Sequence, residues 1–171
     1  LNNGIGGPEA FYWGIMFPAS TLESYAGSFM TKVSIFDYAT SSGDIMIYYG
    51  GSSSPQYLIH TQPYSLSGTN EFVEFDLTSA LPINPETNVW VIFSTSQGAN
   101  YPASCCANTG DSNGRWISLD GSTWEDLMDY SLDNTWMIRA FVTDETRTSV
   151  SELMPITDYN YNVSDGILKA Q

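Results

Sequence analysis

Charged and apolar residues alternate almost without interruption along Glu71-Phe72-Val73-Glu74-Phe75-Asp76-Leu77. Successive side chains of a β-strand point to opposite faces of a sheet, so a period of two predicts a strand that is buried on one side and wet on the other. By contrast, residues 89–93 (Val-Trp-Val-Ile-Phe) lack polar alternation and are β-branched or aromatic. This second run predicts a central strand that is covered on both faces.

Similar runs recur along the chain at spacings of about 8 to 20 residues, separated by Gly, Ser, Asn, Asp and Pro. About eight short strands in this arrangement predict an all-β fold, an antiparallel β-sandwich with a jelly-roll-like course. An up-and-down barrel is the alternative, which the uneven strand and loop lengths disfavour. The runs that we interpret as strands, besides the two above, are 11–17, 30–36, 45–49, 57–62, 116–119, 124–127 and 136–142.

The segments between the strands carry more specific expectations. A single short helical turn is expected within residues 19–27, and a hairpin is expected between 30–36 and 45–49 around the turn at 41–44. Asp120-Gly121 is a tight-turn signal between the runs 116–119 and 124–127. Residues 97–114 are polar and read as one long loop.

The sandwich is expected to occupy residues 1–143. Residues 144–171 are predicted to form a linker followed by a C-terminal β-hairpin around Ser164-Asp165-Gly166. The hairpin is either the start of a following module or an appendage that docks on the sandwich. A two-stranded hairpin is not stable alone, so one of these two contexts is needed.

The excess of acidic residues disfavours negatively charged binding partners. The chain has 5 Lys and Arg against 19 Asp and Glu, a net charge of −14. Nucleic acids and anionic membranes need a basic face, which these few cations do not supply. No apolar run reaches the ~18 residues of a membrane span, so no membrane insertion is expected. The Ser, Thr, Asn and Tyr bias favours a secreted or cell-surface protein.

Catalysis has little support in the sequence. His60 is the single histidine, so any nucleophile–histidine pair has to use it, and no GxSxG, HExxH or phosphate-binding glycine loop is present. Glu74 and Asp76 share a strand face and are the candidate carboxylates of a jelly-roll glycoside hydrolase, although that face is the solvated one. A non-enzymatic role is the primary expectation, and the hydrolase is the alternative.

Adjacent Cys105 and Cys106 have two interpretations. A vicinal disulfide would present a rigid sulfur patch on the 97–114 loop as part of a ligand platform, although the two Cα atoms are only about 3.8 Å apart. The other interpretation is a pair of thiols or a crosslink to another chain.

The same loop contains Asn108-Thr109-Gly110-Asp111-Ser112-Asn113-Gly114. Its oxygen-rich side chains make Asp111 and Asn113 candidate Ca²⁺ ligands, although the spacing is not that of an EF-hand. A plain Asx-turn loop explains the same residues, and no other cofactor is expected.

Aromatic residues are the best functional signal, since they exceed what a small core can use. Sugar rings stack on Trp and Tyr while Asp, Asn and Arg bind their hydroxyls. Tyr101 and Trp124 lie in or beside polar loops, and Arg115 adjoins one, so these three are the candidate ligand-binding residues. The surplus aromatics are Tyr12, Trp13, Tyr48, Tyr49, Tyr101, Trp116, Trp124 and Trp136, of which Trp116 and Trp136 are expected in the core.

Several short segments occur in this order along residues 11–142: Phe17-Pro18-Ala19, Tyr25-Ala26-Gly27, Thr31-Lys32-Val33-Ser34, Ile47-Tyr48-Tyr49-Gly50-Gly51, Tyr101-Pro102-Ala103, Trp116-Ile117-Ser118-Leu119-Asp120-Gly121 and Trp136-Met137-Ile138-Arg139-Ala140. In these segments the chain resembles the β-sandwich adhesion modules of secreted and surface proteins of Bacteroidetes, which occur beside fibronectin-III-like repeats and gingipain-like peptidases. The resemblance implies cell adhesion or accessory binding and assigns no site residue.

These observations together predict a non-catalytic adhesion or carbohydrate-binding module, monomeric within a larger exported bacterial protein. Its expected partner is a glycan or an extracellular protein surface. The alternatives are the hydrolase, a peptidase-associated accessory domain, and a structural spacer stiffened by calcium.

Overall fold

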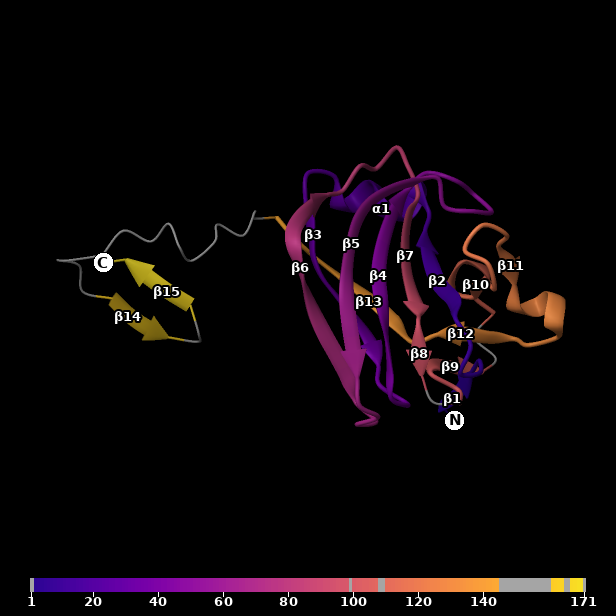
Figure 1. Cartoon of the computed structure of the whole chain (residues 1–171). Helices are drawn as coiled ribbons and strands as arrows, with labels where there is room; N and C mark the ends of the chain where they lie inside the picture. Colours follow the sequence, from indigo (N-terminus) through magenta and orange to yellow (C-terminus); the bar gives the residue numbers. More distant parts are fainter. Residues whose placement is uncertain (1, 99, 108–109, 145–160, 165–166, 171) are drawn as a thin grey trace.

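The structure is a computed structural model that describes residues 2–98, 100–107, 110–144, 161–164 and 167–170. Strands dominate it, with one short α-helix and three 3-10 turns (Figure 1). In chain order the elements are β1 (Asn2–Ile5), β2 (Phe11–Phe17), α1 (Ala19–Leu22), η1 (Glu23–Tyr25), β3 (Phe29–Phe36), β4 (Ser41–Tyr49), β5 (Tyr57–Leu66), β6 (Phe72–Pro82), β7 (Val89–Thr95), β8 (Gln97–Gly98), β9 (Ala103–Ala107), η2 (Ser112–Gly114), β10 (Trp116–Ser118), β11 (Glu125–Asp126), η3 (Leu127–Tyr130), β12 (Asn134–Trp136), β13 (Ile138–Thr143), β14 (Tyr161–Ser164) and β15 (Ile167–Ala170).

Two antiparallel sheets form the two layers of a sandwich (Figure 1). The large sheet has the order β11-β10-β2-β7-β4-β5, with β8 paired to β4, and the facing sheet has the order β13-β3-β6. A third, small sheet has the order β1-β9-β12, and its strand β12 directly precedes β13 in the chain. The predicted all-β antiparallel sandwich is confirmed, whereas its jelly-roll-like course stays a prediction.

The core lies between the two layers. The rings of Tyr64 from β5 and Phe75 from β6 meet at 6.0 Å in an edge-on arrangement. The amide of Gln62 bonds the backbone of β6 on both sides, donating to the Asp76 carbonyl at 3.0 Å and accepting from Thr78 N–H at 3.1 Å. A side chain of one edge strand therefore satisfies backbone groups of the other and joins the layers.

β6 behaves as its alternating sequence predicts. Leu77 is buried and Phe75 packs against the core, while Glu74 and Asp76 lie on the outer side with Lys32 of β3. The Lys32 ammonium is 2.6 Å from Glu74 and 4.0 Å from Asp76. The two candidate hydrolase carboxylates are therefore bound to a cation on a solvated sheet face.

β7 is the central strand, as its uninterrupted apolar sequence predicts. All seven of its residues are buried, and it lies between β2 and β4. Val89, Val91 and Phe93 belong to the core between the sheets, whereas Trp90 and Ile92 belong to a second cluster on the outer face of the large sheet.

The hairpin expected between 30–36 and 45–49 is wrong. β3 pairs with β6 and β13 in one sheet, and β4 pairs with β5 and β7 in the other. The residues at 41–44 are not a turn but the start of β4. The chain crosses between the layers at residues 37–40, which is how consecutive strands of a sandwich bury apolar faces against each other.

The single loop expected over 97–114 is also wrong, because β9 runs through it. β9 pairs with β1 on one side and with β12 on the other. Its small residues Ala103 and Ser104 are fully buried, which explains why the segment carries no strongly apolar signal. The short helical turn is present as α1 and η1, and the hairpin around Asp120-Gly121 is present as β10 and β11.

Toward the C-terminus, β14 and β15 form an antiparallel pair. The expected linker falls mainly on residues 145–160, which lie outside the described residues. The division of the chain at residue 143 therefore stays a prediction.

Asp37 stabilises the segment in which the chain passes from one sheet to the other. Its side chain is buried and accepts hydrogen bonds from the N–H groups of Ser67, Gly68 and Thr69, at 2.8–3.2 Å, and from the Thr69 hydroxyl at 3.0 Å. Three consecutive backbone donors make a concave anion site. One carboxylate thus ties the segment after β3 to the loop between β5 and β6.

We expect Asp37→Ala to lower the free energy of unfolding by about 2–3 kcal/mol, because it removes a buried charged acceptor together with its four hydrogen bonds. Urea unfolding followed by tryptophan fluorescence measures the change. Asp44→Ala, at an exposed carboxylate, is the matched control and should stay within about 0.5 kcal/mol of wild type. Equal stabilities for the two variants would contradict the role of Asp37.

Candidate functional site

The outer face of the large sheet carries a cluster of aromatic and methionine side chains. The strand register places them in rows across the sheet. One row joins Tyr48, Trp90 and Met16, and the next joins Met46, Ile92, Gly14 and Trp116. We call this surface the aromatic face: Tyr12, Met16, Met46, Tyr48, Trp90, Ile92, Trp116 and Trp124.

Trp90 is the base of the aromatic face. It is fully buried, and its ring centroid is 5.2 Å from that of Trp116 and 5.9 Å from that of Trp124. Its indole N–H donates to the Gly51 carbonyl at 3.1 Å, which fixes the ring. Trp116 and Trp124 are partly exposed, so solvent reaches their side chains but not the buried Trp90 ring against which they pack.

Gly14 makes room for this packing. A Cβ atom at this position would lie 2.7 Å from the Val91 carbonyl oxygen and 2.8 Å from Cγ1 of Ile92. Trp116 is the cross-strand neighbour of Gly14. The missing side chain in β2 thus leaves the space that the Ile92 side chain occupies on the outer face of the sheet.

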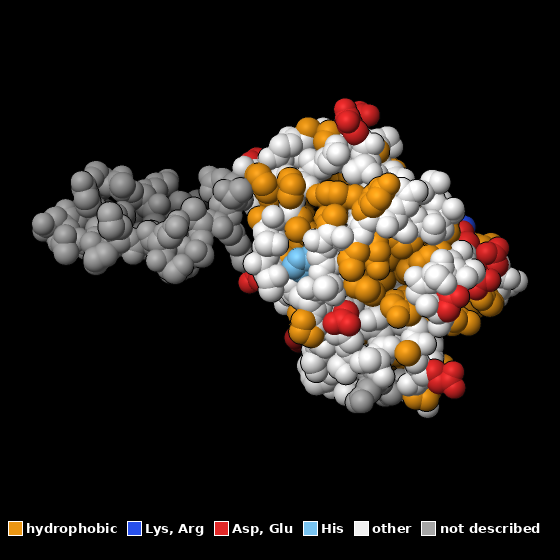
Figure 2. All heavy atoms as spheres, turned by 45° about the horizontal axis from the view of Figure 1, so that its top comes forward, with side chains coloured by type: hydrophobic (Ala, Val, Ile, Leu, Met, Phe, Trp, Pro, Cys, Tyr) orange, Lys and Arg blue, Asp and Glu red, His pale blue; other side chains and the backbone are white. Residues whose placement is uncertain are grey.

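Figure 2 shows hydrophobic side chains gathered over β4, β7 and β2, with polar atoms around them. Leu58, which is 51% exposed, is the cross-strand neighbour of Tyr48 and extends the apolar surface onto β5. A contiguous, partly exposed apolar area of this kind on a protein of net charge −14 is typical of a binding surface.

A hydrogen-bonded turn at residues 120–123 positions Trp124 on the aromatic face. The Asp120 carboxylate accepts from the N–H groups of Ser122 and Thr123 at 2.8 and 2.7 Å, and from the Thr123 hydroxyl at 3.0 Å. These donors, the Thr123 N–H first, hold the pKa of Asp120 well below its usual range. Gly121 has a positive φ of 77° and lies against the Tyr12 ring, so the turn is also packed on the sheet.

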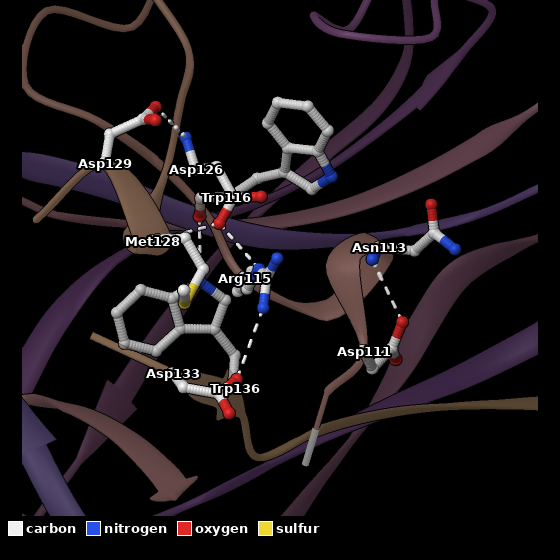
Figure 3. A network of polar contacts seen from close by, with 9 residues as sticks. All are labelled: Asp111, Asn113, Arg115, Trp116, Asp126, Met128, Asp129, Asp133 and Trp136. Carbon is white, nitrogen blue, oxygen red and sulfur yellow. Dashed lines mark hydrogen bonds and ion pairs between the residues drawn. The ribbon is translucent and has the colours of Figure 1, made fainter. Parts of the chain in front are cut away.

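Arg115 forms ion pairs with two carboxylates of the same chain (Figure 3). Its Nε atom is 2.6 Å from Asp126 and its Nη1 atom is 3.3 Å from Asp133, and the side chain is only 14% exposed. Asp126 also caps η3 by accepting from Met128 N–H at 2.8 Å. The guanidinium therefore holds β11 and the segment before β12 together.

Tyr101 lies apart from the other predicted ligand residues. It is 58% exposed in the turn before β9, has a φ of 65°, and its N–H donates to the Gly6 carbonyl at 2.9 Å. It is not a member of the aromatic face. Of the residues predicted from sequence, the structure thus brings Trp124 to this surface and leaves Tyr101 beside the N-terminal segment.

Cys105 and Cys106 lie in strand β9 and not on a loop, and both are free thiols in the structure, as the second interpretation expects. Their part in ligand binding stays a prediction. Adjacent strand residues point to opposite faces, and Cys105 is fully buried. Burial raises the pKa of the Cys105 thiol to about 11, and the Cys106 thiol donates to the Thr135 carbonyl at 3.7 Å.

Asp111 and Asn113, the predicted calcium ligands, lie in the wall of a pocket of about 360 Å³. The Asp111 carboxylate accepts from Asn113 N–H at 2.9 Å and begins η2 (Figure 3), as the Asx-turn alternative expects. The other walls come mainly from the end of β2 and from β12 and β13, and Met16 is shared with the aromatic face.

No group of three or more His, Cys, Asp or Glu side chains suited to a metal ion occurs among the described residues, which omit 108 and 109 of this loop. Calcium binding at Asp111 and Asn113 therefore stays a prediction. Melting curves in excess Ca²⁺ and in EDTA test it, because a ligand of the folded state raises the melting temperature.

The surface aromatics that sequence reasoning missed were the neighbours of Trp124. Tyr12 and Tyr48 were in the surplus, and Trp116 was expected in the core. The signal was in the strands: Tyr12, Met16, Met46 and Tyr48 each alternate with inward residues of the same strand. Only the strand order shows that these positions share one face.

Comparisons with protein-family models, curated proteins and solved structures give no match. Among the described residues, no helix has the length and apolar character that crossing a membrane requires. The function therefore has to be argued from the surface itself.

We expect the two thiols to differ in reactivity. Native protein at pH 8 should take up iodoacetamide at Cys106 and not at Cys105, since the buried thiol is protonated until the pH nears its pKa of about 11. Peptide mass spectrometry assigns the label, and urea-unfolded protein is the control that labels at both. Absence of label from both unfolded cysteines would show that they are disulfide-bonded.

Proposed function

We propose that this chain is a non-catalytic glycan-binding module and that the aromatic face binds the glycan. The observation that carries the proposal is the convergence of Tyr12, Tyr48, Trp116 and Trp124 on one side of the large sheet, around a fixed tryptophan. These four side chains come from three strands and a loop. None of them belongs to the core between the two sheets, which lies on the other face of the large sheet.

The chemistry of such a surface suits a sugar chain. Pyranose rings have apolar C–H faces that stack on aromatic rings, and amphipathic Tyr and Trp side chains supply both contact area and a polar group. The rings here are held by packing and by the Gly51 hydrogen bond, so binding would order few side chains.

One polar group on this face lacks a partner. The indole Nε1 of Trp116 is buried and makes no hydrogen bond with the described residues. A donor in this state is unfavourable within a protein, because it has lost water without gaining an acceptor. A sugar hydroxyl that reached it would satisfy it, which is a second reason to place the ligand here.

The setting of the module is proposed from the sequence. The resemblance of residues 11–142 to Bacteroidetes adhesion modules and the polar, acidic composition support a secreted or cell-surface location within a larger protein. The acids Glu74 and Asp76 are occupied by Lys32, and His60 bonds Gln62 at 2.8 Å. These contacts favour binding over hydrolysis as the activity.

We expect Trp124→Ala to weaken binding of the best neutral glycan on an array by at least about tenfold, because it removes an exposed stacking ring. Isothermal titration calorimetry measures the change. Tyr25→Ala is the matched control, since Tyr25 is a 43% exposed aromatic in η1 that is not part of the aromatic face.

Thermal melts of both variants separate loss of binding from loss of folding. A variant that melts within a few degrees of wild type and no longer binds supports the proposal. Loss of binding in Tyr101→Ala with full binding in Trp124→Ala would instead move the site to the turn before β9 and contradict it.

A further inference from the structure

We propose that the aromatic face selects uncharged and amine-bearing glycans and rejects acidic ones, an inference that rests on the proposed glycan-binding function. The juxtaposition that carries it is an apolar stacking surface edged by carboxylates, while the cations described within residues 2–144 are already paired with other groups of the protein. An acidic glycan, whether uronate, sialylated or sulfated, needs a cation or an aligned set of donors to bind.

Three cationic side chains lie among the described residues of 2–144, and each of them has a partner; Lys169 belongs to β15. Arg115 is paired with Asp126 and Asp133. Lys32 is bound by Glu74, and the Arg139 guanidinium stacks 3.5 Å above the Phe72 ring. Lys32 and Arg139 belong to the β13-β3-β6 sheet, which lies across the core from the aromatic face.

Carboxylates border the aromatic face on two sides. Asp44 precedes Met46 on β4 by two residues, so it shares the same outer face and is exposed. Asp120 lies in the turn that packs on Tyr12, and it is ionised over the whole neutral range because its pKa is lowered. Asp126 is the cross-strand neighbour of Trp116, but its charge is paired with Arg115, so Asp44 and Asp120 are the carboxylates that act on a ligand.

The remaining polar side chains of this border are neutral. Ser94 is the cross-strand neighbour of Tyr12 on one side, and its hydroxyl accepts from Asp44 N–H at 3.0 Å. Ser118 is the neighbour of Tyr12 on the other side, and its hydroxyl donates to the Asp120 carboxylate at 3.2 Å. Both serines are buried, so the carboxylates are the border groups that meet a ligand, and carboxylates bind sugar hydroxyls and ammonium groups but repel anions.

The charge of the whole chain acts in the same direction. A net charge of −14 produces a negative field that lowers the local concentration of anionic ligands and raises that of cationic ones. This long-range effect is screened by salt, with a Debye length of about 30 Å at 0.01 M and about 8 Å at 0.15 M. Local repulsion from Asp44 and Asp120 persists at the higher salt concentration.

The test compares four hexasaccharides by isothermal titration calorimetry: β-1,4-linked glucose, N-acetylglucosamine, glucosamine and galacturonic acid. We expect galacturonate to bind at least roughly tenfold more weakly than the best neutral hexamer at about 0.01 M salt, with a smaller gap at about 0.15 M. Glucosamine should bind at least as tightly as N-acetylglucosamine.

A charge reversal localises the effect. Asp44→Lys should strengthen galacturonate binding by several-fold and leave the neutral hexamers unchanged, whereas Glu23→Lys changes the net charge equally from η1, off the aromatic face. Equal gains in both variants would attribute rejection to the overall charge and overturn the role assigned to the face.

The outcomes also separate the inference from its premise. Wild-type protein that binds galacturonate as tightly as the neutral hexamers overturns the charge selection while keeping the glycan-binding function. Binding of none of the four hexamers, by protein with a normal melting curve, removes the proposed function and the inference with it.

Discussion

The structure depends on β7 being buried on both sides. Its Val89, Val91 and Phe93 side chains fill the space between the two sheets, and its Trp90 and Ile92 side chains point away from that space. A sheet strand in a sandwich normally has one wet face. Here the second face has to be covered as well, and the covering residues come from β2, β4, β10 and the loop before β11.

That requirement connects several features that are far apart in the sequence. Gly14 leaves the space that the Ile92 side chain occupies, Asp120 holds the turn that carries Trp124, and Arg115 ties this part of the chain to Asp126 and Asp133. Each of these contacts is structural, and together they position a partly exposed layer of aromatic rings. The surface that supports a binding function is thus the outer covering of a central strand.

The sequence predicted the strands better than their arrangement. The alternation at 71–77 and the apolar run at 89–93 identify β6 and β7, because side-chain periodicity reflects one strand at a time. The predicted pairing of β3 with β4 is wrong because the choice of strand partners depends on the whole fold and not on adjacency in the sequence. β9 was missed because Ala103, Ser104 and Cys105 are small, and their burial leaves no periodic apolar signal.

The site was predicted in part, for similar reasons. Trp124 stood out because it is an aromatic residue beside polar ones, whereas Tyr12, Tyr48 and Trp116 read as ordinary strand residues. Arg115 looked available in the sequence because the two aspartates that bind it are 11 and 18 positions away, at 126 and 133. Composition does predict the sign of the charge, and the structure adds which charges are already paired.

The central claim is that the ligand lies on the outer face of the large sheet. The indole N–H signals of the five tryptophans in a ¹⁵N–¹H correlation spectrum test it directly during titration with the best-binding neutral hexasaccharide. The account predicts shifts for Trp116 and Trp124, with Trp13 unchanged in the core. Unchanged Trp116 and Trp124 signals at saturating ligand would contradict it.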